Sequence, residues 1–269
     1  MPELPEVETS LRGIAPFLDG YDIESIIVRN GALRWPVPES VSQLEHQSVQ
    51  TVTRRGKYIV VHFEKGAILI HLGMSGNLRV VEPNTSLQKH DHVDFIVSSG
   101  KVIRFNDPRR FGCVLWADNW QTHKLIQGLG PEPLSELFTG KYLHGKAKGK
   151  KIAIKQLIMN AKLVVGVGNI YANEALFLAG IHPNRIASSI SFKRMKVLVE
   201  CIKQVLNAAI EQGGTTLKDF LGSDGKPGYF KQQLYVYGRA GEACKKCETI
   251  LQEIRQNKRS SVFCSQCQT

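Results

Sequence analysis

The chain has 269 residues, of which 42% are hydrophobic and 22% are charged. This composition is that of a globular protein long enough for two domains, and it excludes a largely disordered chain. Its 35 Lys and Arg residues against 24 Asp and Glu give a formal net charge of +11, which favours a polyanionic partner, nucleic acid above all. No apolar run reaches the ~18 residues of a membrane span, and the acidic start is unlike a secretory signal. We therefore expect a cytoplasmic protein with no membrane partner.

The N-terminus combines a helix signal with a candidate nucleophile. Apolar residues recur at helical spacing after Pro5 and predict an amphipathic helix that ends within residues 16–20. Removal of Met1 would leave a secondary amine at Pro2, beside the carboxylate of Glu3. An α-amino group titrates near ~8, so part of it is neutral near pH 7 and able to attack an aldehyde-like carbon. The alternative is that Pro5 lies in the first turn of the helix and that Glu3, Glu6 and Glu8 only complement its positive end.

Residues 23–120 contain short apolar runs separated by Gly-, Asn- and Ser-containing turns. The clearest runs are Tyr58–Phe63, Ala67–Leu72 and Val93–Val97. Their lengths and spacing predict antiparallel strands of a β-sandwich or barrel. Cys113 lies in another apolar run, so we expect a buried thiol there and not a catalytic one.

A change of pattern after residue 130 indicates a second domain. Pro131, Pro133 and the glycine- and lysine-rich residues 140–151 predict a linker. A helix is expected over residues 152–159, followed by a break at the glycines of residues 164–169.

The next helix would run from Asn169 to Leu178, so that the segment has the order helix, two turns, helix. Asn160 is a candidate cap within it. A longer helix is predicted from the apolar spacing of residues 198–209, and Cys201 on its apolar face is expected to be a second core thiol.

Four of the six cysteines form two Cys-x2-Cys pairs with sixteen residues between the pairs: Cys244, Cys247, Cys264 and Cys267. This spacing is typical of a four-cysteine zinc site. Two disulfides are the alternative, but a reducing compartment and a short segment rich in Lys and Arg favour a metal.

Three clusters combine cations, glycines and apolar side chains: Arg54–Tyr58, His71–Gly76 and Asn106–Gly112. The first is suited to binding phosphates. The other two offer a methionine, an arginine pair and a phenylalanine on turns, which are residue types that fill a base stack when a nucleotide is extruded. Each cluster alone is equally typical of solvated loop charge or of core residues.

The strongest basic patch has seven lysines and no acidic residue between Lys141 and Lys162. Gly166 and Gly168 precede the helix that starts at Asn169, and free N–H groups at such a helix start bind phosphates. The glycines lack the longer pattern of a dinucleotide-binding loop.

Taken in chain order, these segments closely resemble the signatures of the formamidopyrimidine-DNA glycosylases, which are relatives of endonuclease VIII. The matching segments span the whole chain: Pro2–Glu8, Arg55–Tyr58, Asn106–Gly112, Val165–Tyr171, Gly213–Thr216 and the four-cysteine finger. Leu4 and the complete Asp107–Phe111 segment favour the purine-directed branch. Asn160 is a departure, because the family usually has aspartate there, although both residues can cap a helix.

The resemblance implies a role for each catalytic position. Pro2 would attack C1′ of the damaged nucleotide, Glu3 would be the acid/base partner for sugar opening, and Glu6 would help to hold the terminus. Lys57 would assist β-elimination and contact phosphate. Arg259, on the hairpin of the finger, would assist δ-elimination.

The resemblance also implies a set of DNA contacts: His90, Arg109, Lys150, Lys155 and Asn169. Met74, Arg109 and Phe111 would fill the space that the flipped nucleotide leaves, and Arg109 would also pair with the orphaned cytosine. The loop from Lys218 to Tyr229 would cover the everted base.

The implied protein is a monomeric bifunctional DNA glycosylase and abasic-site lyase of base excision repair, with one structural zinc ion. Its partner would be double-stranded DNA that contains oxidised purines, such as 8-oxoguanine and formamidopyrimidines, or abasic sites. The predicted fold is α+β with two domains, in which an N-terminal helix and an antiparallel β-sandwich precede a helix-two-turn-helix domain that ends in a four-cysteine hairpin. The expected segments are 1–131 for the catalytic domain, 132–150 for the linker, 151–234 for the helical domain and 235–269 for the finger.

Three alternatives remain at this point. Specificity for oxidised pyrimidines, as in endonuclease VIII, is a close variant. A zinc-finger protein that binds DNA without catalysis would use the same basic surface. An RNA- or ribosome-associated zinc-ribbon protein would account for the charge and the cysteines but not for the Pro2-Glu3 start.

Overall fold

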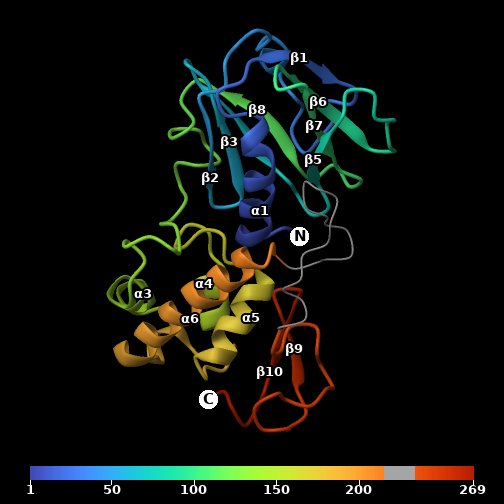
Figure 1. The fold of residues 1–269 in the computed structure, drawn as a ribbon. Coiled ribbons are helices and arrows are strands. Elements are labelled where there is room, and N and C mark those ends of the chain that lie inside the picture. The colour runs from blue at the N-terminus through green and yellow to red at the C-terminus, as the bar shows by residue number, and fades with distance from the viewer. Residues whose placement is uncertain (215–233) are drawn as a thin grey trace. The chain divides into compact units, whose positions relative to one another are not determined.

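The computed structural model describes residues 1–214 and 234–269. The chain divides into two compact units (Figure 1). Of the described residues, the first unit comprises 1–128 and 212–214, and the second comprises 129–211 and 234–269.

The first unit begins with helix α1 (Leu4–Ile14), which confirms the helix predicted after Pro5. A 3-10 turn, η1 (Ala15–Phe17), ends it, and Gly20 adopts a φ of 77° at the turn into the first strand. The apolar face of α1 is buried, because helical spacing places its hydrophobic residues on one side.

Two four-stranded antiparallel sheets form the body of the first unit (Figure 1), which confirms the predicted β-sandwich. The strand order is β2-β3-β4-β8 in one sheet and β1-β6-β7-β5 in the other. The strands are β1 (Ile23–Val28), β2 (Thr51–Arg55), β3 (Tyr58–His62), β4 (Ala67–His71), β5 (Asn77–Val81), β6 (Asp91–Val97), β7 (Lys101–Asn106) and β8 (Cys113–Ala117). A short helix, α2 (Glu39–Ser42), lies between β1 and β2.

One hydrophobic cluster takes side chains from both sheets and from α1, including Ile59, Ile103 and Val7. Cys113 on β8 is fully buried, as predicted. The sheets therefore share a core, and the turns at their ends are free to carry polar functional groups.

The described part of the second unit is mainly helical. Its helices are α3 (Gly140–Ala147), α4 (Ile154–Ile158), α5 (Asn169–Leu178), the 3-10 turn η2 (Ala187–Ser189) and α6 (Phe192–Glu211). The order α4, two turns, α5 confirms the predicted helix-two-turn-helix, and Cys201 is 8% exposed on α6. None of the described helices combines the length and the apolar character that a bilayer crossing needs.

The structure corrects the linker predicted over residues 140–151. Residues 140–147 form α3, whose N-cap Thr139 accepts the backbone N–H of Tyr142 at 3.1 Å. Leu143 and Ala147 lie one turn apart and are buried, since α3 packs on α6. The polar composition concealed a helix with a narrow apolar face.

The C-terminal hairpin consists of β9 (Gln252–Gln256) and β10 (Arg259–Phe263), which pair antiparallel. Asn257 and Lys258 form the turn, with φ values of 48° and 62°. Positive φ at both positions is the requirement of a type I′ turn. The hairpin packs against α5, and Val262 and Phe177 share a small apolar cluster.

Candidate functional site

The N-terminal residues are held by the first turn of α1. Glu3 is the N-cap residue, and its side chain accepts the backbone N–H of Glu6, while the Glu6 carboxylate accepts the Glu3 N–H at 2.8 Å. This capping box fixes two buried carboxylates, 3% and 0% exposed, at the positive end of the helix. Pro2 is also buried and directly precedes the cap. The nitrogen of Pro2 is thus carried by a backbone that the capping box keeps in place.

Gly214 lies against the same carboxylate. A Cβ on Gly214 would be 3.1 Å from Oε1 of Glu6, and its φ of 79° is itself unfavourable for other residues. Sequence reasoning recognised this glycine only as part of a motif. The structure gives it a physical role, because close packing on Glu6 requires the absence of a side chain.

Lys57 is presented by a two-residue turn between β2 and β3. The preceding Gly56 has a φ of 59°, which the first position of a type II′ turn requires. Arg54 ties the turn to α1, since its Nε donates to Glu8 at 2.8 Å and its Nη1 donates to the Gly56 carbonyl at 3.0 Å. Burial raises the pKa of Glu8, but the hydrogen bonds and charges of Arg54 and Arg12 outweigh it, and the pKa is lowered. The ion pair that fixes the turn therefore persists at neutral pH.

Asp107 organises two turns at the end of the sandwich. It is fully buried, and its carboxylate accepts the Ser75 hydroxyl at 3.0 Å, the Gly112 N–H at 2.8 Å and the Arg109 N–H at 3.3 Å. A Cβ on Gly73 would lie 2.4 Å from the Gly112 nitrogen, so the two turns are in direct backbone contact. One carboxylate thus joins the turn after β4 to the turn after β7.

These turns present the three side chains predicted to fill a gap in a base stack. Met74 is 38% exposed and Phe111 is 44% exposed. Arg109 is exposed, and its guanidinium carbon lies 4.8 Å from the centroid of the Phe111 ring. We call Met74, Arg109 and Phe111 the wedge cluster. The arrangement suits insertion between bases, because apolar side chains on a rigid turn can replace a stacking partner.

His90 lies beside the same turn and is half-buried. It has a φ of 76°, its carbonyl accepts the Asp107 N–H at 3.1 Å, and its ring centroid is 6.2 Å from that of His92. The Asn106 amide donates to the carbonyl of Lys89 at 3.0 Å and holds the preceding residue. The strained backbone of His90 is therefore fixed from both sides.

In the second unit, the lysine-rich segment divides into two classes. Six of its seven lysines are exposed, including Lys150. Lys155 is the exception at 2% exposed, and its Nζ donates to the carbonyl of Ser260 at 2.7 Å and to the hydroxyl of Ser261 at 2.6 Å. The exposed lysines can bind phosphates directly, whereas Lys155 faces the hairpin.

Asn169 begins α5, as predicted. Gly168 is the N-cap, Gly166 has a φ of 79°, and the first turn contains no acidic residue. The Oδ1 atom of Asn169 is buried and has no hydrogen-bond partner among the residues that the structure describes. A helix start with a glycine N-cap and no acidic side chain in its first turn is consistent with an anion-binding end.

The four predicted metal ligands lie together, with their Sγ atoms all within 4.8 Å of one another. Cys247 is 3.4 Å from both Cys264 and Cys267, and Cys244 is 4.0 Å from Cys267. A tetrahedral zinc ion with Zn–S bonds of ~2.3 Å places its sulfurs ~3.8 Å apart, so this set fits zinc. The zinc is structural, because four thiolates leave no open coordination position.

Arg259 is the first residue of β10 and is exposed next to the I′ turn. Arg259, Gln256 and Lys155 line one cavity of about 190 Å³, together with Gln156, Met159 and Asn257. The guanidinium of Arg259 is thus presented by a paired strand and not by a flexible tail.

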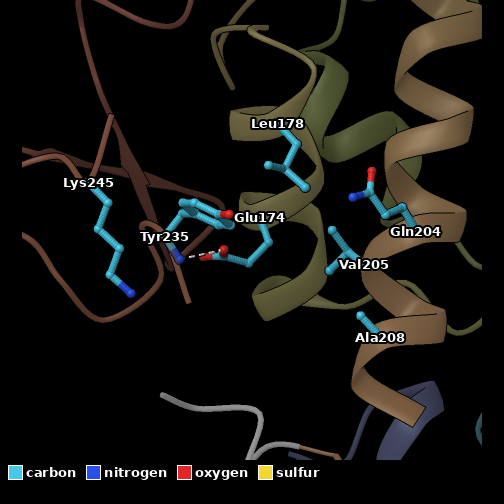
Figure 2. Close-up of a pocket in the computed structure, with 7 residues that line it drawn as sticks. All are labelled: Glu174, Leu178, Gln204, Val205, Ala208, Tyr235 and Lys245. Carbon is cyan, nitrogen blue, oxygen red and sulfur yellow. Dashed lines mark hydrogen bonds between the residues drawn. The ribbon is translucent and has the colours of Figure 1, made fainter. Parts of the chain in front are cut away.

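A larger cavity, of about 340 Å³, lies elsewhere in the second unit, between α5, α6 and the start of the finger (Figure 2). Its walls are mostly apolar, and Glu174 points into it beside Tyr235. The Glu174 carboxylate accepts the backbone N–H groups of Tyr235, Val236 and Tyr237 at 2.7, 3.0 and 2.8 Å. Burial raises the pKa of Glu174, although the three donors oppose the shift. All these contacts anchor the finger, so this cavity is structural in character.

The candidate residues therefore form groups within each unit. The first unit brings Glu3 and Glu6 together at the start of α1, and the wedge cluster together with His90 around Asp107. The second unit brings Lys155 and Arg259 to one cavity and assembles the four cysteines. The loop from Lys218 to Tyr229, predicted to cover the base, lies outside the described residues.

Comparison with known protein families identifies three consecutive domains. Residues 1–114 match the formamidopyrimidine-DNA glycosylase N-terminal domain, residues 129–221 match the formamidopyrimidine-DNA glycosylase H2TH domain, and residues 241–269 match the zinc finger found in FPG and IleRS. The three matches together cover most of the chain.

This chain is also similar to known proteins over its whole length. The formamidopyrimidine-DNA glycosylases of Photobacterium profundum and of Escherichia coli O7:K1 are each 56% identical over 268 residues and are covered completely. Among solved structures, a Lactococcus lactis FPG mutant bound to DNA containing Fapy-dG aligns with a TM-score of 0.92 at 31% identity and complete coverage of both chains. MutM from Thermus thermophilus aligns with a TM-score of 0.89 at 33% identity, covering 99% of this chain and 98% of its own.

Proposed function

Since this chain belongs to the formamidopyrimidine-DNA glycosylase family, it is a DNA glycosylase of base excision repair, and we propose that Pro2 is its nucleophile. The observation that carries this proposal is the capping box of Glu3 and Glu6, which fixes the backbone that bears the Pro2 nitrogen and places two buried carboxylates beside it. Removal of Met1 frees the secondary amine. The partner is double-stranded DNA with formamidopyrimidine lesions or abasic sites, since solved relatives hold both.

The proposed reaction begins when the Pro2 nitrogen attacks C1′ and the bond to the damaged base breaks. Glu3 supplies the proton that opens the sugar. The resulting iminium acidifies the C2′ proton, and its loss breaks the C3′–O bond in β-elimination, which Lys57 assists. Loss of the C4′ proton then breaks the C5′–O bond in δ-elimination, which Arg259 assists. The electron pair leaves with the phosphate each time, so no metal catalyst is needed.

Extrusion of the damaged nucleotide costs a few kcal/mol of stacking and pairing. We propose that the wedge cluster offsets this cost from one side, with Arg109 also contacting the orphaned cytosine. His90, Lys150 and Asn169 would bind the DNA backbone, and Lys155, predicted as a further DNA contact, would act through the hairpin to which its Nζ donates. Oxidised purines such as 8-oxoguanine are the proposed substrates, because the segment from Asp107 to Phe111 is complete.

We also propose that the protein acts as a monomer in the cytoplasm, associated with the nucleoid through DNA. The exposed lysines of residues 141–162 support the association with the nucleoid, because cationic surfaces bind duplex DNA without sequence preference.

The test is a labelled duplex with one 8-oxoguanine opposite cytosine, incubated with and without borohydride and resolved on one denaturing gel. A one-nucleotide gap and a trapped adduct are expected. Pro2→Gly should lose most of the trapping while retaining binding, and Pro16→Gly, at an exposed proline after α1, serves as the matched control.

Mass spectrometry of the same protein should show that Met1 is absent. Equal trapping by an N-terminally blocked protein would overturn the Pro2 assignment. Binding to DNA without cleavage of any lesion in a panel would favour the alternative of a zinc-finger protein that binds DNA without catalysis.

A further inference from the structure

Arg259 depends on a hairpin that is short and isolated from other strands. Among the described strands, β9 and β10 pair only with each other, and Arg259 is paired with Gln256 next to the turn. A two-stranded hairpin of this length has marginal stability by itself. The geometry of the hairpin must therefore be fixed by the elements against which the hairpin packs.

One anchor is a buried ammonium group. Lys155 lies on α4, 105 residues earlier in the chain than Ser260, and it places Nζ within hydrogen-bond distance of two hairpin oxygens. A lysine is almost never fully buried unless its charge is matched by good acceptors. Here the acceptors come from β10 itself, directly after Arg259.

The hydroxyl of Ser261 continues this connection. Ser261 is fully buried, and while its Oγ accepts from Lys155, it donates to Oε1 of Gln256 at 2.5 Å. The Gln256 amide nitrogen then donates to Oδ1 of Asn184 at 2.5 Å and to the carbonyl of Pro183 at 3.2 Å. The hydrogen bonds thus run in one direction from α4, across the hairpin, to the loop before η2.

A second side chain fixes the far end of β10. Asn173, 1% exposed on α5, accepts the Val262 N–H at 2.9 Å and donates to the Asn169 carbonyl at 2.6 Å. The strand is therefore held at two points along its length. The anchor nearer to Arg259 is the one that includes Ser261.

We propose that the buried chain formed by Lys155, Ser261 and Gln256 positions Arg259 for δ-elimination. Lys155 then acts as a positioning residue through the hairpin, since its Nζ is directed to β10. The inference rests on the proposed function, because it assumes that Arg259 assists the second elimination. It adds Ser261 and Gln256, two residues that contact neither DNA nor the nucleophile in the proposed mechanism.

Adjacent serines allow a matched experiment. Ser261→Ala removes the hydroxyl that links Lys155 to Gln256. Ser260→Ala keeps the backbone carbonyl that accepts from Lys155 and removes a hydroxyl that is not part of this series of hydrogen bonds. Ser261→Thr restores the hydroxyl. The measurement is the ratio of β-elimination product to β,δ-elimination product from a preformed abasic-site duplex, together with the yield of borohydride-trapped adduct.

Ser261→Ala should raise the ratio of β-elimination product to β,δ-elimination product about tenfold, as the loss of one hydrogen bond to a charged group would allow, with the trapping yield unchanged. Ser260→Ala and Ser261→Thr should keep the wild-type ratio. A general loss of stability would lower trapping and both products together. An unchanged ratio in Ser261→Ala, or the same change in both alanine variants, would overturn the proposal.

Zinc content and circular dichroism establish that each variant is folded. If Ser261→Ala does not retain one zinc per protein molecule, Gln256→Leu tests the proposal in its place. It breaks the same series of hydrogen bonds and leaves Ser261 bound to Lys155. It should shift the ratio in the same direction, and no shift would reject the proposal. Failure of the proposed function looks different, since the wild-type protein itself would then give neither trapped adduct nor cleavage.

Discussion

The hydroxyl of Ser75 donates to the carboxylate of Asp107 at 3.0 Å, and this bond, together with the backbone contact between Gly73 and Gly112, joins the turn that carries Met74 to the turn that carries Arg109 and Phe111. Both partners are buried, so water does not compete for the bond. The wedge cluster is therefore one preorganised unit and not three independent side chains. Preorganisation matters here because an intercalating group must be rigid to offset the cost of unstacking.

Ser75→Ala should weaken the coupling between the two turns. The lost hydrogen bond to a charged group is worth about 1.5–3 kcal/mol, so excision of 8-oxoguanine from duplex DNA should slow at least about tenfold. Cleavage of a preformed abasic site should slow less, because no base has to be extruded. Single-turnover rates on the two substrates check this.

Ser86→Ala provides the control, since Ser86 is exposed and remote from Asp107 in the sequence. It should leave both rates unchanged. Equal slowing of both reactions in Ser75→Ala would show that the bond supports general stability and not extrusion.

His71 makes the Met74 turn sensitive to acid. Burial and the nearby cations Lys57 and Arg34 lower the pKa of His71 to about 4, and its Nδ1 accepts the Gly73 N–H at 3.0 Å. The folded-state pKa is depressed, so this stabilising contribution is present above the unfolded pKa of ~6.5 and is lost as pH falls toward 4. Between pH 7 and pH 5 the free energy of unfolding should fall by about 2 kcal/mol from this group alone.

His71→Asn should remove that dependence, because the asparagine oxygen can accept the same N–H without titrating. Denaturant unfolding of both proteins at pH 7 and pH 5 measures the difference. His46→Asn is the control, since His46 is exposed and has a φ of 64° that asparagine tolerates. If the wild-type and His71→Asn proteins lose the same free energy on acidification, His71 is not the sensitive group.

Short-range chemistry made much of this molecule predictable from sequence. The helix after Pro5, the β-sandwich and the four-cysteine cluster depend on local spacing, and all three are confirmed. The roles of individual site residues remain predictions, because they depend on atoms of a substrate. The ordered motifs nevertheless led to the correct family.

The features that sequence did not reveal depend on distant partners. The polar run at residues 140–147 hides α3, whose apolar contacts come from α6. Lys155 belongs to a lysine-rich segment that predicts an exposed cation, yet its acceptors lie more than 100 residues away. Gly214 packs on Glu6 for the same kind of reason. No periodicity encodes such pairings.

Removal of zinc should abolish DNA cleavage, although the zinc takes no direct part in the attack by Pro2. Structural zinc contributes about 10–16 kcal/mol of apparent binding energy in finger peptides, so its loss should unfold the finger and release the hairpin of Arg259. We expect one zinc per chain by atomic spectroscopy, and Cys264→Ser should lose both zinc and tight DNA binding. Cys201→Ala is the control, since Cys201 lies on α6 outside the four-cysteine cluster and its loss should leave the zinc content unchanged. Full cleavage by a zinc-free protein would contradict a structural role for the metal.

The exposed lysines should set the salt dependence of DNA binding. Each phosphate contact that releases a counterion contributes about 0.9 to the slope of log affinity against log salt. Lys150→Ala should therefore weaken binding to damaged and undamaged duplexes alike and reduce the slope by about one. Lys65→Ala, which removes an exposed lysine in the first unit outside the predicted contact set, should leave the slope unchanged.

Fluorescence anisotropy at several salt concentrations gives both slopes. An unchanged slope in Lys150→Ala would show that Lys150 does not bind a phosphate, whereas weaker binding to damaged DNA alone would give it a role in lesion recognition.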